Sequence, residues 1–295
     1  MASKRILVTG ANKGIGFAIC ESLLSSHPDT SVLLGSRDAG RGKEAVEKLL
    51  AAIPAAKDRV ELLMIDTASD SSVEAAAKTV GEKFGREGSL YGIINNAGIF
   101  PPPGTGDLGE VFEVNVKGPW RVCNAFMSML DQKVGRVVNI ASAAGPMFLA
   151  KISEDEQKPF LDPNVTWDNI TALMTAYLTG SKSTDTTGQP TLMNAYGLSK
   201  ALLNAYTRFL FKQNPHLTIV SCTPGFIETD MTRGFATSQN KTPQEMGMKG
   251  TEDGAKVPVA LMMEPVKGNG WYYGSDGLRS PLDKYRGPCD PEYTD

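Results

Sequence analysis

The chain has 295 residues, and its 30 basic and 33 acidic side chains give a formal net charge of −3. Apolar residues make up 41% and charged residues 21% of it, which excludes a disordered chain, a collagen-like fibre and a disulfide-stapled miniprotein. Because there is no basic excess, a nucleic-acid partner is not expected. The length suits one large α/β domain or two domains of ~150 residues. No linker or repeat divides the sequence, so we expect a single domain over residues 1–295.

Nothing in the sequence indicates a membrane or secretory protein. The longest apolar runs are far shorter than the ~18 residues that span a bilayer. The first ten residues, MASKRILVTG, lack the apolar core and cleavage site of a signal peptide. The four cysteines form no CxxC pair, and no Cys/His cluster has metal-ligand spacing. We therefore expect a cytoplasmic protein with reduced thiols and without a membrane or metal partner.

Short apolar runs alternate with helical stretches through the first 140 residues. Strands are expected at 6–9, 31–34, 60–65, 91–94 and 136–140, and helices at 14–24, 42–53, 72–84 and 108–130. The apolar runs do not alternate with polar residues, which is typical of strands covered by helices on both faces. Repeated βα units at this spacing predict a Rossmann-type, doubly wound parallel sheet of the α/β class.

Two irregular stretches interrupt this pattern in the second half of the chain. Residues 147–190 contain several prolines and a polar run, and we expect an insertion with one short helix at 167–178. The second irregular stretch is 224–250. The remaining elements are expected as helices at 192–211 and 251–263 and strands at 217–222 and 271–273. We expect Thr251-Glu252-Asp253 to cap the helix at 251, and the tail at about 275–295 to be an extended surface segment.

A glycine-rich turn, TGANKGIG at 9–16, joins the first expected strand to the first helix. Glycines let the backbone turn tightly and approach a pyrophosphate, whose charge then lies at the helix N-terminus. Such turns also occur without a ligand, but the position after strand one favours a nucleotide. The candidate cofactor-binding residues of this turn are Gly10, Asn12, Lys13, Gly14, Ile15 and Gly16.

Together with later motifs, this turn gives the chain a resemblance to the short-chain dehydrogenase/reductase family over residues 4–273. The later motifs are NNAG at 95–98, Asn115 in EVNVKG, Ser142, YGLSK at 196–200 and Pro224-Gly225. The resemblance implies a cofactor site that uses residues after strands three, four and six. These residues are Asp66 and Thr67 for the adenine, Asn96, Ala97 and Gly98, Pro224 and Gly225, and Ile227 and Thr229 for the nicotinamide carboxamide.

Tyr196 and Lys200 stand at positions i and i+4 and so share one helix face. A nearby ammonium favours the phenolate, so we expect Lys200 to lower the Tyr196 pKa from its free value of about 10. Such a tyrosine could donate a proton to a forming alkoxide. The resemblance implies that Tyr196 is the general acid and that Lys200 also holds the nicotinamide ribose. It further implies that Ser142 binds the substrate carbonyl and that Asn115 holds a water that relays protons to the lysine.

The end of the second strand indicates NADP(H) rather than NAD(H). An NAD enzyme commonly has an acidic residue there, whereas this chain has Gly35-Ser36-Arg37 with Arg41 beyond. The planar, charged fork of arginine suits a 2′-phosphate, and Lys13 adds a second positive charge that Asp38 partly offsets. Alternatively, Arg37 and Arg41 are exposed residues at a helix start, an interpretation that suits Arg41 better.

Tyr196 stands 54 positions after Ser142, a much longer separation than most family members have. This insertion, with Asn12-Lys13 and SRDAGRG at 36–42, resembles the NADPH-dependent carbonyl reductase branch. There the insertion packs over a helix that other members use for dimer contacts, which implies a monomer. Apolar side chains flank the catalytic positions and suit a hydrophobic carbonyl substrate, although any of them could instead be core. The candidate pocket residues are Ala143, Met147, Phe148, Met193, Phe226, Met231 and Phe235.

The expected function is therefore the NADPH-dependent reduction of a ketone, aldehyde or quinone to an alcohol, by hydride transfer with Tyr196 as general acid. Alcohol oxidation uses the same groups and stays open. Reduction of a conjugated alkene is a further alternative, against which the intact Tyr196 weighs. A non-catalytic NADP(H)-binding sensor on the same fold is also conceivable, but such a protein would be free to lose the serine, tyrosine or lysine.

Overall fold

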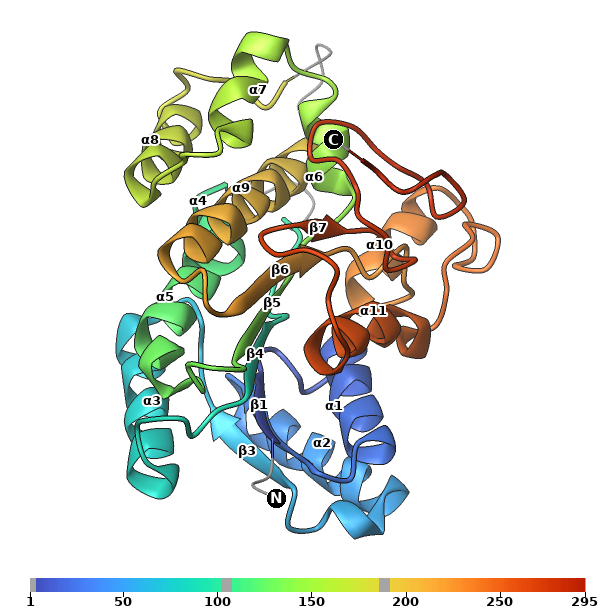
Figure 1. The fold of residues 1–295 in the computed structure, drawn as a ribbon. Helices are drawn as coiled ribbons and strands as arrows, with labels where there is room; N and C mark the ends of the chain where they lie inside the picture. The colour runs from blue at the N-terminus through green and yellow to red at the C-terminus, as the bar shows by residue number, and fades with distance from the viewer. Residues whose placement is uncertain (1–3, 102–107, 186–191, 295) are drawn as a thin grey trace.

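A parallel sheet forms the centre of the molecule in the computed structural model, which describes residues 4–101, 108–185 and 192–294 (Figure 1). In this described part, seven strands pair in the order β3-β2-β1-β4-β5-β6-β7, each pair parallel. The strands are β1 (Lys4–Val8), β2 (Thr30–Ser36), β3 (Val60–Met64), β4 (Gly92–Asn95), β5 (Arg136–Ile140), β6 (Thr218–Cys222) and β7 (Tyr272–Tyr273). The strand order reverses between β1 and β4, as in a doubly wound sheet. The predicted fold class is confirmed.

Helices cover both faces of this sheet (Figure 1). One face packs against α1 (Gly14–Ser26), α2 (Ala39–Ala52) and α11 (Thr251–Met263), and the other against α3 (Asp70–Phe84), α4 (Leu108–Asn115), α5 (Lys117–Phe126) and α9 (Leu192–Gln213). Successive strand residues point to opposite faces, so Ile6 and Val8 of β1 join one buried cluster and Leu7 joins the other. Two separate cores therefore hold the sheet from its two sides.

Most predicted elements are present, with ends within three residues of the prediction. The helix predicted at 108–130 is wrong as a single element, because α4 ends at Asn115 and α5 begins at Lys117, followed by the short η2 (Met127–Met129). Pro119 in the first turn of α5 explains the break. Its ring has no N–H and would clash with the carbonyl of Asn115 in a continuous helix.

The two irregular stretches contain more structure than predicted. The insertion holds α7 (Glu154–Leu161) as well as the predicted α8 (Trp167–Leu178), and α6 (Ala144–Leu149) leads into it. A capping box between Ser153 and Glu156 starts α7, whereas Pro159 within it disguises the helical pattern. Residues 224–250 contain α10 (Asp230–Ser238), and the short η1 (Pro54–Ala56) follows α2. The expected cap at Thr251 is also wrong, since the extended Gly250 precedes α11 and no side chain caps it.

The insertion packs on the outer side of the helix layer formed by α5 and α9. Trp167 of α8 stacks on Trp120 of α5, with ring centroids 4.9 Å apart and planes 5° from parallel. The same indole meets Tyr206 of α9 edge-on at 5.7 Å. Figure 1 shows α7 and α8 beyond α9, and their buried side chains Phe160, Ile170 and Leu173 extend the core on that face of the sheet. No helix in the described ranges is both long and apolar enough to cross a membrane.

Candidate active site

The loops that follow β1, β2, β3, β4, β5 and β6 carry most of the residues singled out in the sequence. Each loop leaves the carboxyl end of its strand, and the strands are parallel, so the loops meet at one edge of the sheet. In open α/β sheets, ligands bind outside this edge where the strand order reverses. The reversal here lies between β1 and β4, which carry the glycine turn and the NNAG motif.

The glycine turn approaches the β4 loop so closely that a side chain would not fit. A Cβ atom on Gly10, whose φ is +61°, would lie 2.8 Å from the Cα atom of Ala97, and one on Gly16 would lie 2.4 Å from Nδ2 of Asn96. Lys13 precedes α1 without a side-chain cap. The first N–H groups of a helix have no partner within the helix, so this uncapped turn presents donors to an anion.

Asn96 connects the two loops through its side chain and backbone. Its Nδ2 atom donates to the carbonyl oxygens of Thr9 at 2.9 Å and Gly10 at 3.1 Å. In return, Oγ1 of Thr9 accepts the backbone N–H groups of Asn96 and Ala97, both at 3.0 Å. These bonds hold the floor of the predicted cofactor site rigid, and Asn96 acts in it as a structural residue.

Tyr196, Lys200 and Ser142 come together next to this floor. Nζ of Lys200 lies 5.5 Å from the ring centroid of Tyr196, as expected for i and i+4 on α9, and donates to the carbonyl oxygen of Ile140 at 2.8 Å. The Ser142 side chain, two residues beyond the end of β5, lies close enough to Tyr196 to act on its proton affinity. A Cβ atom on Gly98 would lie 3.6 Å from Nζ of Lys200, so the β4 loop passes close to the lysine.

Two glycines explain how α6 and α9 approach closely enough for Ser142 to reach Tyr196. A Cβ atom on Gly197 would lie 2.6 Å from the carbonyl oxygen of Ala144, and one on Gly145 would lie 3.0 Å from the backbone nitrogen of Ala201. Any side chain at either place would push the two helices apart. The glycine in YGLSK therefore has a packing role beside the catalytic candidates.

Asn115 lies at the end of α4, fully buried, and all its side-chain contacts are internal. Oδ1 accepts the backbone N–H of Ile99 at 2.8 Å, while Nδ2 donates to the Ile99 carbonyl at 2.9 Å and to Oγ of Ser199 at 3.0 Å. Ser199 in turn donates to the carbonyl oxygen of Tyr196 at 2.7 Å. Asn115 thus joins the β4 loop to the first turns of α9.

Burial determines the proton affinities of the central pair. It raises the pKa of Tyr196 to about 12, although the neighbouring Ser142 hydroxyl acts in the opposite direction. Burial also lowers the pKa of Lys200 to about 8. The expectation that Lys200 brings the Tyr196 pKa below 10 is therefore wrong for this structure. The ammonium lies over the ring face and donates to Ile140, so it does not offset the cost of a buried phenolate.

The cations near the end of β2 have different surroundings. Arg37 is exposed, and within the described residues it makes no hydrogen bond or ion pair. Arg41 pairs with Asp38 through Nη2 at 3.1 Å, and Asp38 caps α2 by accepting the N–H of Arg41 at 2.9 Å. Arg41 thus has the alternative role of a helix-start residue, and Asp38 offsets its charge rather than that of Arg37. Nζ of Lys13 pairs with Oδ2 of Asp230 at 2.7 Å.

The loop after β6 lies across the glycine turn. Gly225 has a φ of +95°, which favours glycine, and the half-buried Pro224 precedes it. A Cβ atom on Gly14 would lie 3.7 Å from Cγ2 of Thr229. Ile227 is 2% exposed, and its side chain packs beside that of Ile15 next to Gly254.

The residues after β3 lie further out along the same edge. Oδ1 of Asp66 accepts the N–H of Ala68 at 3.1 Å, and Asp66 is only half-buried. Thr67 is buried beneath Gly118, where a Cβ atom would lie 3.1 Å from its Oγ1 atom. The half-buried Asn12 lies within the glycine turn.

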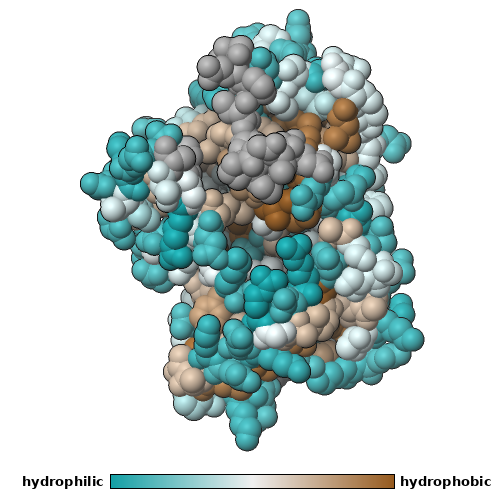
Figure 2. Space-filling model, turned by 180° about the vertical axis from the view of Figure 1, so that it is seen from behind, coloured by the Kyte–Doolittle hydropathy of each residue, from teal (hydrophilic) through white to brown (hydrophobic). Residues whose placement is uncertain are grey.

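Several candidate pocket residues are large apolar side chains that stay exposed: Met147, Met193, Phe226 and Met231. Phe148 is 1% exposed and belongs mainly to the core, Ala143 is half-buried beside Ser142, and the side chain of Phe235 lies outside the described residues. Figure 2 shows apolar surface in patches over one face of the molecule, with the most strongly apolar patches in its upper half. Exposed apolar groups that cluster in this way usually mark a binding site.

A cavity of about 310 Å³ lies between α6, the start of α9 and the C-terminal tail. Its lining residues are Ala144, Met147, Phe148, Ala150, Lys151, Met193, Asn194 and Tyr285. A larger open hollow of about 770 Å³ lies between α7 and α8, and it is lined by none of the predicted site residues. Among the described residues, no three His, Cys, Asp or Glu side chains gather as a metal site would require.

The same motifs occur in known proteins. Residues 4–153 match the family described as short chain dehydrogenase. A (+)-neomenthol dehydrogenase from Arabidopsis thaliana is 32% identical over 287 residues, which cover 88% of this chain and 91% of that protein. The chain belongs to this family. Carbonyl reductase [NADPH] 3 from Rattus norvegicus is 31% identical, covering 89% of this chain and 92% of the rat protein. As a short chain dehydrogenase, the protein is an oxidoreductase.

Solved structures agree with this short chain dehydrogenase fold. The menthone neomenthol reductase from Mentha piperita superposes with a TM-score of 0.73 and 25% identity, covering 93% of this chain and 99% of the other. The salutaridine reductase from Papaver somniferum also gives a TM-score of 0.73, with 26% identity and coverage of 92% and 99%.

Two aromatic residues of this short chain dehydrogenase were missed in the sequence. Phe100 follows the NNAG motif, and its ring centroid lies 5.3 Å from that of Tyr196. Its apolar character directly after a site motif was a usable signal. Tyr285 lines the cavity from the tail. Only the folded chain brings it there, since 89 positions separate it from Tyr196.

Proposed function

We propose that this short chain dehydrogenase reduces apolar ketones, aldehydes or quinones to alcohols with NADPH. The observation that carries the proposal is the grouping of Ser142, Tyr196 and Lys200, with Nζ of Lys200 5.5 Å from the Tyr196 ring centroid and a methionine-lined cavity beside them. Two hydroxyls grouped in this way can both point to one carbonyl oxygen. The apolar cavity then gives the rest of the substrate a place to bind.

The proton affinities of the site support reduction. A Tyr196 pKa of about 12 keeps the phenol protonated at neutral pH, so it holds the proton that a general acid must give. When bound, the cofactor supplies the hydride to the carbonyl carbon. After Tyr196 has given its proton, Lys200, whose pKa is about 8, is the more acidic neighbour and can return one. In our proposal Ser142 orients the carbonyl, and Asn115 holds the β4 loop and α9 in register.

The choice of NADP(H) is supported by charge and by fit. The uncapped start of α1 and the close approach at Gly10 and Gly16 leave backbone room for a pyrophosphate. Arg37, exposed and unpaired within the described residues, would hold a 2′-phosphate, with Lys13 as a second cation. The rat relative is named as an NADPH enzyme. We assign weaker cofactor roles to Arg41, which Asp38 already pairs.

We also propose that the protein is a monomer in the cytoplasm. The stack of Trp167 on Trp120 places the insertion over α5 and α9, a surface that is then not free for a second copy. Cys20, Cys123 and Cys222 are buried and unpaired, as is usual for reduced proteins. Light scattering after size exclusion should give the mass of one chain. A dimer mass would overturn the assignment.

The test of the function is the consumption of NADPH with a panel of ketones, aldehydes, quinones and enones, with NADH in parallel. Alcohols with NADP⁺ complete the panel, since the Arabidopsis relative is named a dehydrogenase. We expect turnover of apolar carbonyls with a strong NADPH preference. Turnover confined to enones or to alcohol oxidation would overturn the proposed reaction. Cofactor binding, seen as a thermal shift, without any turnover would favour a sensor.

A further inference from the structure

We propose that the C-terminal tail, residues 275–294, supplies one wall of the substrate site and that Tyr285 is a specificity-determining residue within it. The proposal rests on the proposed function for the class of ligand, an apolar carbonyl compound or its alcohol. The location of the proposed wall comes from the structure, in which Tyr285 of the tail lines the cavity together with residues of α6 and α9.

The cavity wall is made of large apolar side chains that stay partly open to solvent. Tyr285 is 50% exposed, Met147 on α6 is 42% exposed and Met193 on α9 is 39% exposed. Single exposed apolar side chains are common, but several that gather around one cavity often mark a ligand or partner site. Two flexible thioethers facing a rigid phenol can adapt to apolar groups of different shape, while the phenol keeps a polar tip in solvent.

The cavity adjoins the catalytic candidates on both sides. Met193 stands three residues before Tyr196 on α9, which places the two on one helix face. Met147 lies on α6, which begins two residues after Ser142 and packs against α9. Tyr272 at the end of β7 has both Tyr285 and Tyr196 among its electrostatic neighbours. A carbonyl held by Ser142 and Tyr196 would therefore extend its apolar part toward Tyr285.

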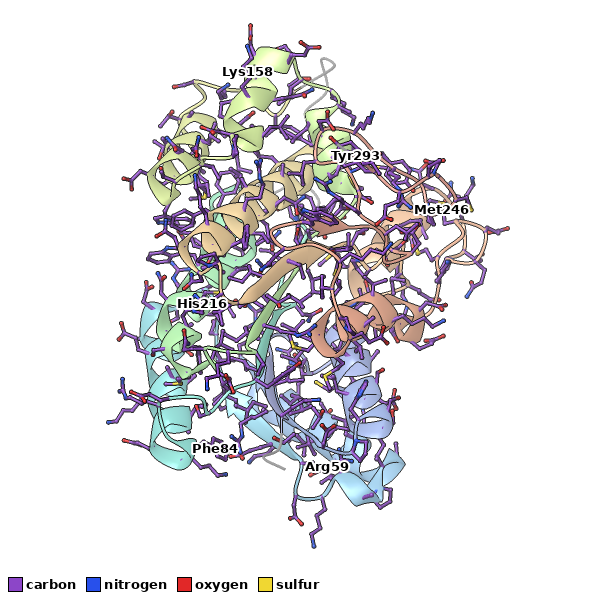
Figure 3. All side chains as sticks on the ribbon, in the orientation of Figure 1. Arg59, Phe84, Lys158, His216, Met246 and Tyr293 are labelled. Atoms are coloured by element: carbon purple, nitrogen blue, oxygen red, sulfur yellow. The ribbon has the colours of Figure 1, made fainter. Side chains whose placement is uncertain are left out.

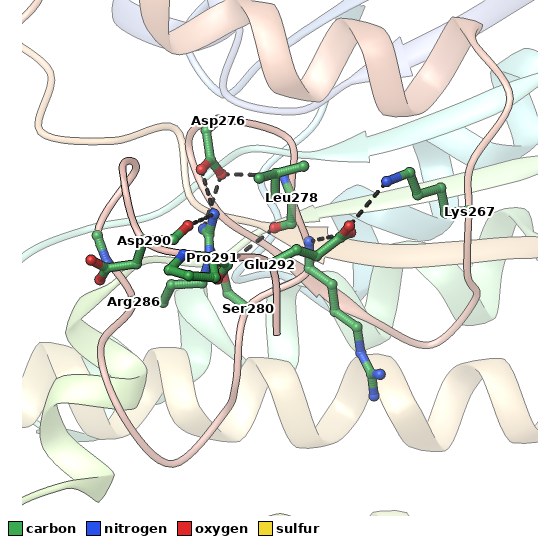
Figure 4. A network of polar contacts seen from close by, with 10 residues as sticks. Lys267, Asp276, Leu278, Ser280, Arg286, Asp290, Pro291 and Glu292 are labelled. Atoms are coloured by element: carbon green, nitrogen blue, oxygen red, sulfur yellow. Dashed lines mark hydrogen bonds and ion pairs between the residues drawn. The ribbon is translucent and has the colours of Figure 1, made fainter. Parts of the chain in front are cut away.

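Arg286, the residue after Tyr285, fastens the tail (Figure 4). Its side chain is 5% exposed, and all five guanidinium N–H groups have acceptors. Nη2 and Nη1 bind the two carboxylate oxygens of Asp276 at 2.5 and 3.1 Å. The other bonds go to Oγ of Ser280 at 3.3 Å and to the carbonyl oxygens of Asp290 at 3.0 Å and Pro291 at 2.8 Å. A loop tied in this way presents Tyr285 in one place.

Further contacts anchor the tail on either side of Tyr285. Leu282 packs against the core, and Nζ of Lys267 pairs with Glu292 at 3.0 Å. Glu292 also accepts the N–H of Arg279 at 3.3 Å, and the Arg279 guanidinium lies 4.1 Å from the Trp271 ring centroid. Figure 1 shows the tail running from β7 over to α6. Because these contacts within the chain hold the tail, a substrate that contacts Tyr285 does not bear the whole entropic cost of fixing it.

The kinetic test compares Tyr285→Ala and Tyr285→Phe with carbonyl compounds of increasing apolar size. Loss of an aromatic wall should raise KM for the largest substrates about ten-fold, with the effect shrinking as the apolar group shortens. The conservative phenylalanine should restore most of the affinity. Arg286→Gln should raise KM in the same size-dependent way, and the double variant should be no worse than Tyr285→Ala, because Arg286 acts through Tyr285. A uniform loss of kcat for all sizes would overturn the proposal.

A second test does not depend on turnover. In Tyr285→Cys/Cys289→Ser, the other three cysteines are buried, so a maleimide modifies residue 285. With NADP⁺ present, an apolar ketone or alcohol should slow this modification, followed by mass spectrometry, about five-fold or more. The control is the wild-type protein, whose exposed Cys289 lies four residues along the same tail and should react at an unchanged rate. Circular dichroism confirms that both proteins are folded.

The two tests separate the two proposals. If the wild type reduces no carbonyl but ligands protect residue 285, the proposed reaction fails and the substrate wall stands. If carbonyls are reduced but no compound, including those turned over, protects residue 285, the tail lies outside the site and this inference is overturned.

Discussion

Arginines at the two edges of the sheet have different surroundings. At the amino edge, before β3, the Arg59 guanidinium donates to the carbonyl oxygens of Leu24 at 2.8 Å, Thr30 at 3.1 Å and His27 at 3.3 Å (Figure 3). At the carboxyl edge, after β2, Arg37 is exposed and pairs with no described residue. Arg59 therefore stabilises the fold, whereas Arg37 is available to bind a ligand.

Aromatic and apolar groups show the same difference. At the amino edge, Arg5 lies 3.6 Å from the ring centroid of Phe84 and donates to the Ser89 carbonyl at 2.9 Å (Figure 3). Near the carboxyl edge, Met147 and Met193 stay exposed around a cavity. The parallel strands already make the two edges different in backbone, because the carboxyl edge also carries helix N-termini such as that of α1, and the side chains add to this difference. Substitutions at matched places on the two edges can test this contrast.

The largest effect is expected for Tyr196→Phe at the carboxyl edge. Without the hydroxyl, no proton reaches the forming alkoxide, and kcat/KM for carbonyl reduction should fall by about 10²–10⁴-fold. NADPH affinity, measured by fluorescence titration, should stay close to that of the wild type. The matched control is Tyr91→Phe at the amino edge, where Lys4 lies over the ring, and kcat/KM should not change. A Tyr196→Phe enzyme with most of its rate would show that another group is the acid.

The second largest effects are expected for two arginine substitutions, one of which should change cofactor preference and the other stability. Arg37→Met should raise KM for NADPH about 10- to 100-fold, because a charged contact with the 2′-phosphate is lost, and should leave KM for NADH nearly unchanged. Arg59→Met leaves carbonyl oxygens without a donor, so the free energy of unfolding in urea should fall by about 2 kcal/mol. Its ratio of NADPH to NADH activity should not move. An unchanged ratio in Arg37→Met would remove Arg37 from the cofactor site.

Many residues of the carboxyl edge could be predicted from the local sequence. The glycine turn, the NNAG motif and Ser142 each follow a buried apolar strand, and parallel pairing then brings them to one edge. Tyr196 and Lys200 needed only the helical repeat to share a face. These features depend on neighbours along the chain, so the sequence alone could predict them.

Other features depend on groups far apart in the chain. The pKa of Tyr196 depends on how deeply α9 is packed, which no spacing between residues reveals. Arg41 looked like a cofactor residue until Asp38 was seen to pair with it. The helix α7 was hidden by Pro159, although Ser153 and Glu156 form a readable capping box. Tyr285 reaches the cavity only because Arg286 folds the tail back.

A third prediction compares the effects on stability of replacing Lys200, the buried cation of the candidate site, and Arg59, a cation that stabilises the fold. Burial lowers the folded pKa of Lys200 from its ordinary 10.5 to about 8, so charged Lys200 destabilises the folded state at neutral pH. Lys200→Met should be inactive yet more stable by about 1–2 kcal/mol at pH 7, whereas Arg59→Met is less stable. The measurement is urea unfolding of both variants beside the wild type.

The difference in stability between Lys200→Met and the wild type should depend on pH. Between pH 8 and 10.5 the unfolded chain binds more protons than the folded one, so wild-type stability gains a contribution that rises with pH. Lys200→Met lacks this contribution, and its advantage should therefore be largest below pH 8 and shrink toward pH 10.5. An advantage that does not vary with pH would mean that Lys200 keeps its ordinary pKa in the folded protein.

The smallest effect concerns two exposed ion pairs of similar geometry at the two edges. Lys13 pairs with Asp230 at 2.7 Å at the carboxyl edge, and Lys4 pairs with Asp29 at 3.1 Å at the amino edge. Asp230→Asn frees Lys13 for the cofactor phosphates and should tighten NADPH binding about two- to five-fold at low salt, with the gain lost at high salt. Asp29→Asn should leave NADPH affinity unchanged. If Asp230→Asn instead weakens NADPH binding, the Lys13–Asp230 pair holds α10 over the glycine turn, and Lys13 belongs to the fold as Arg59 does.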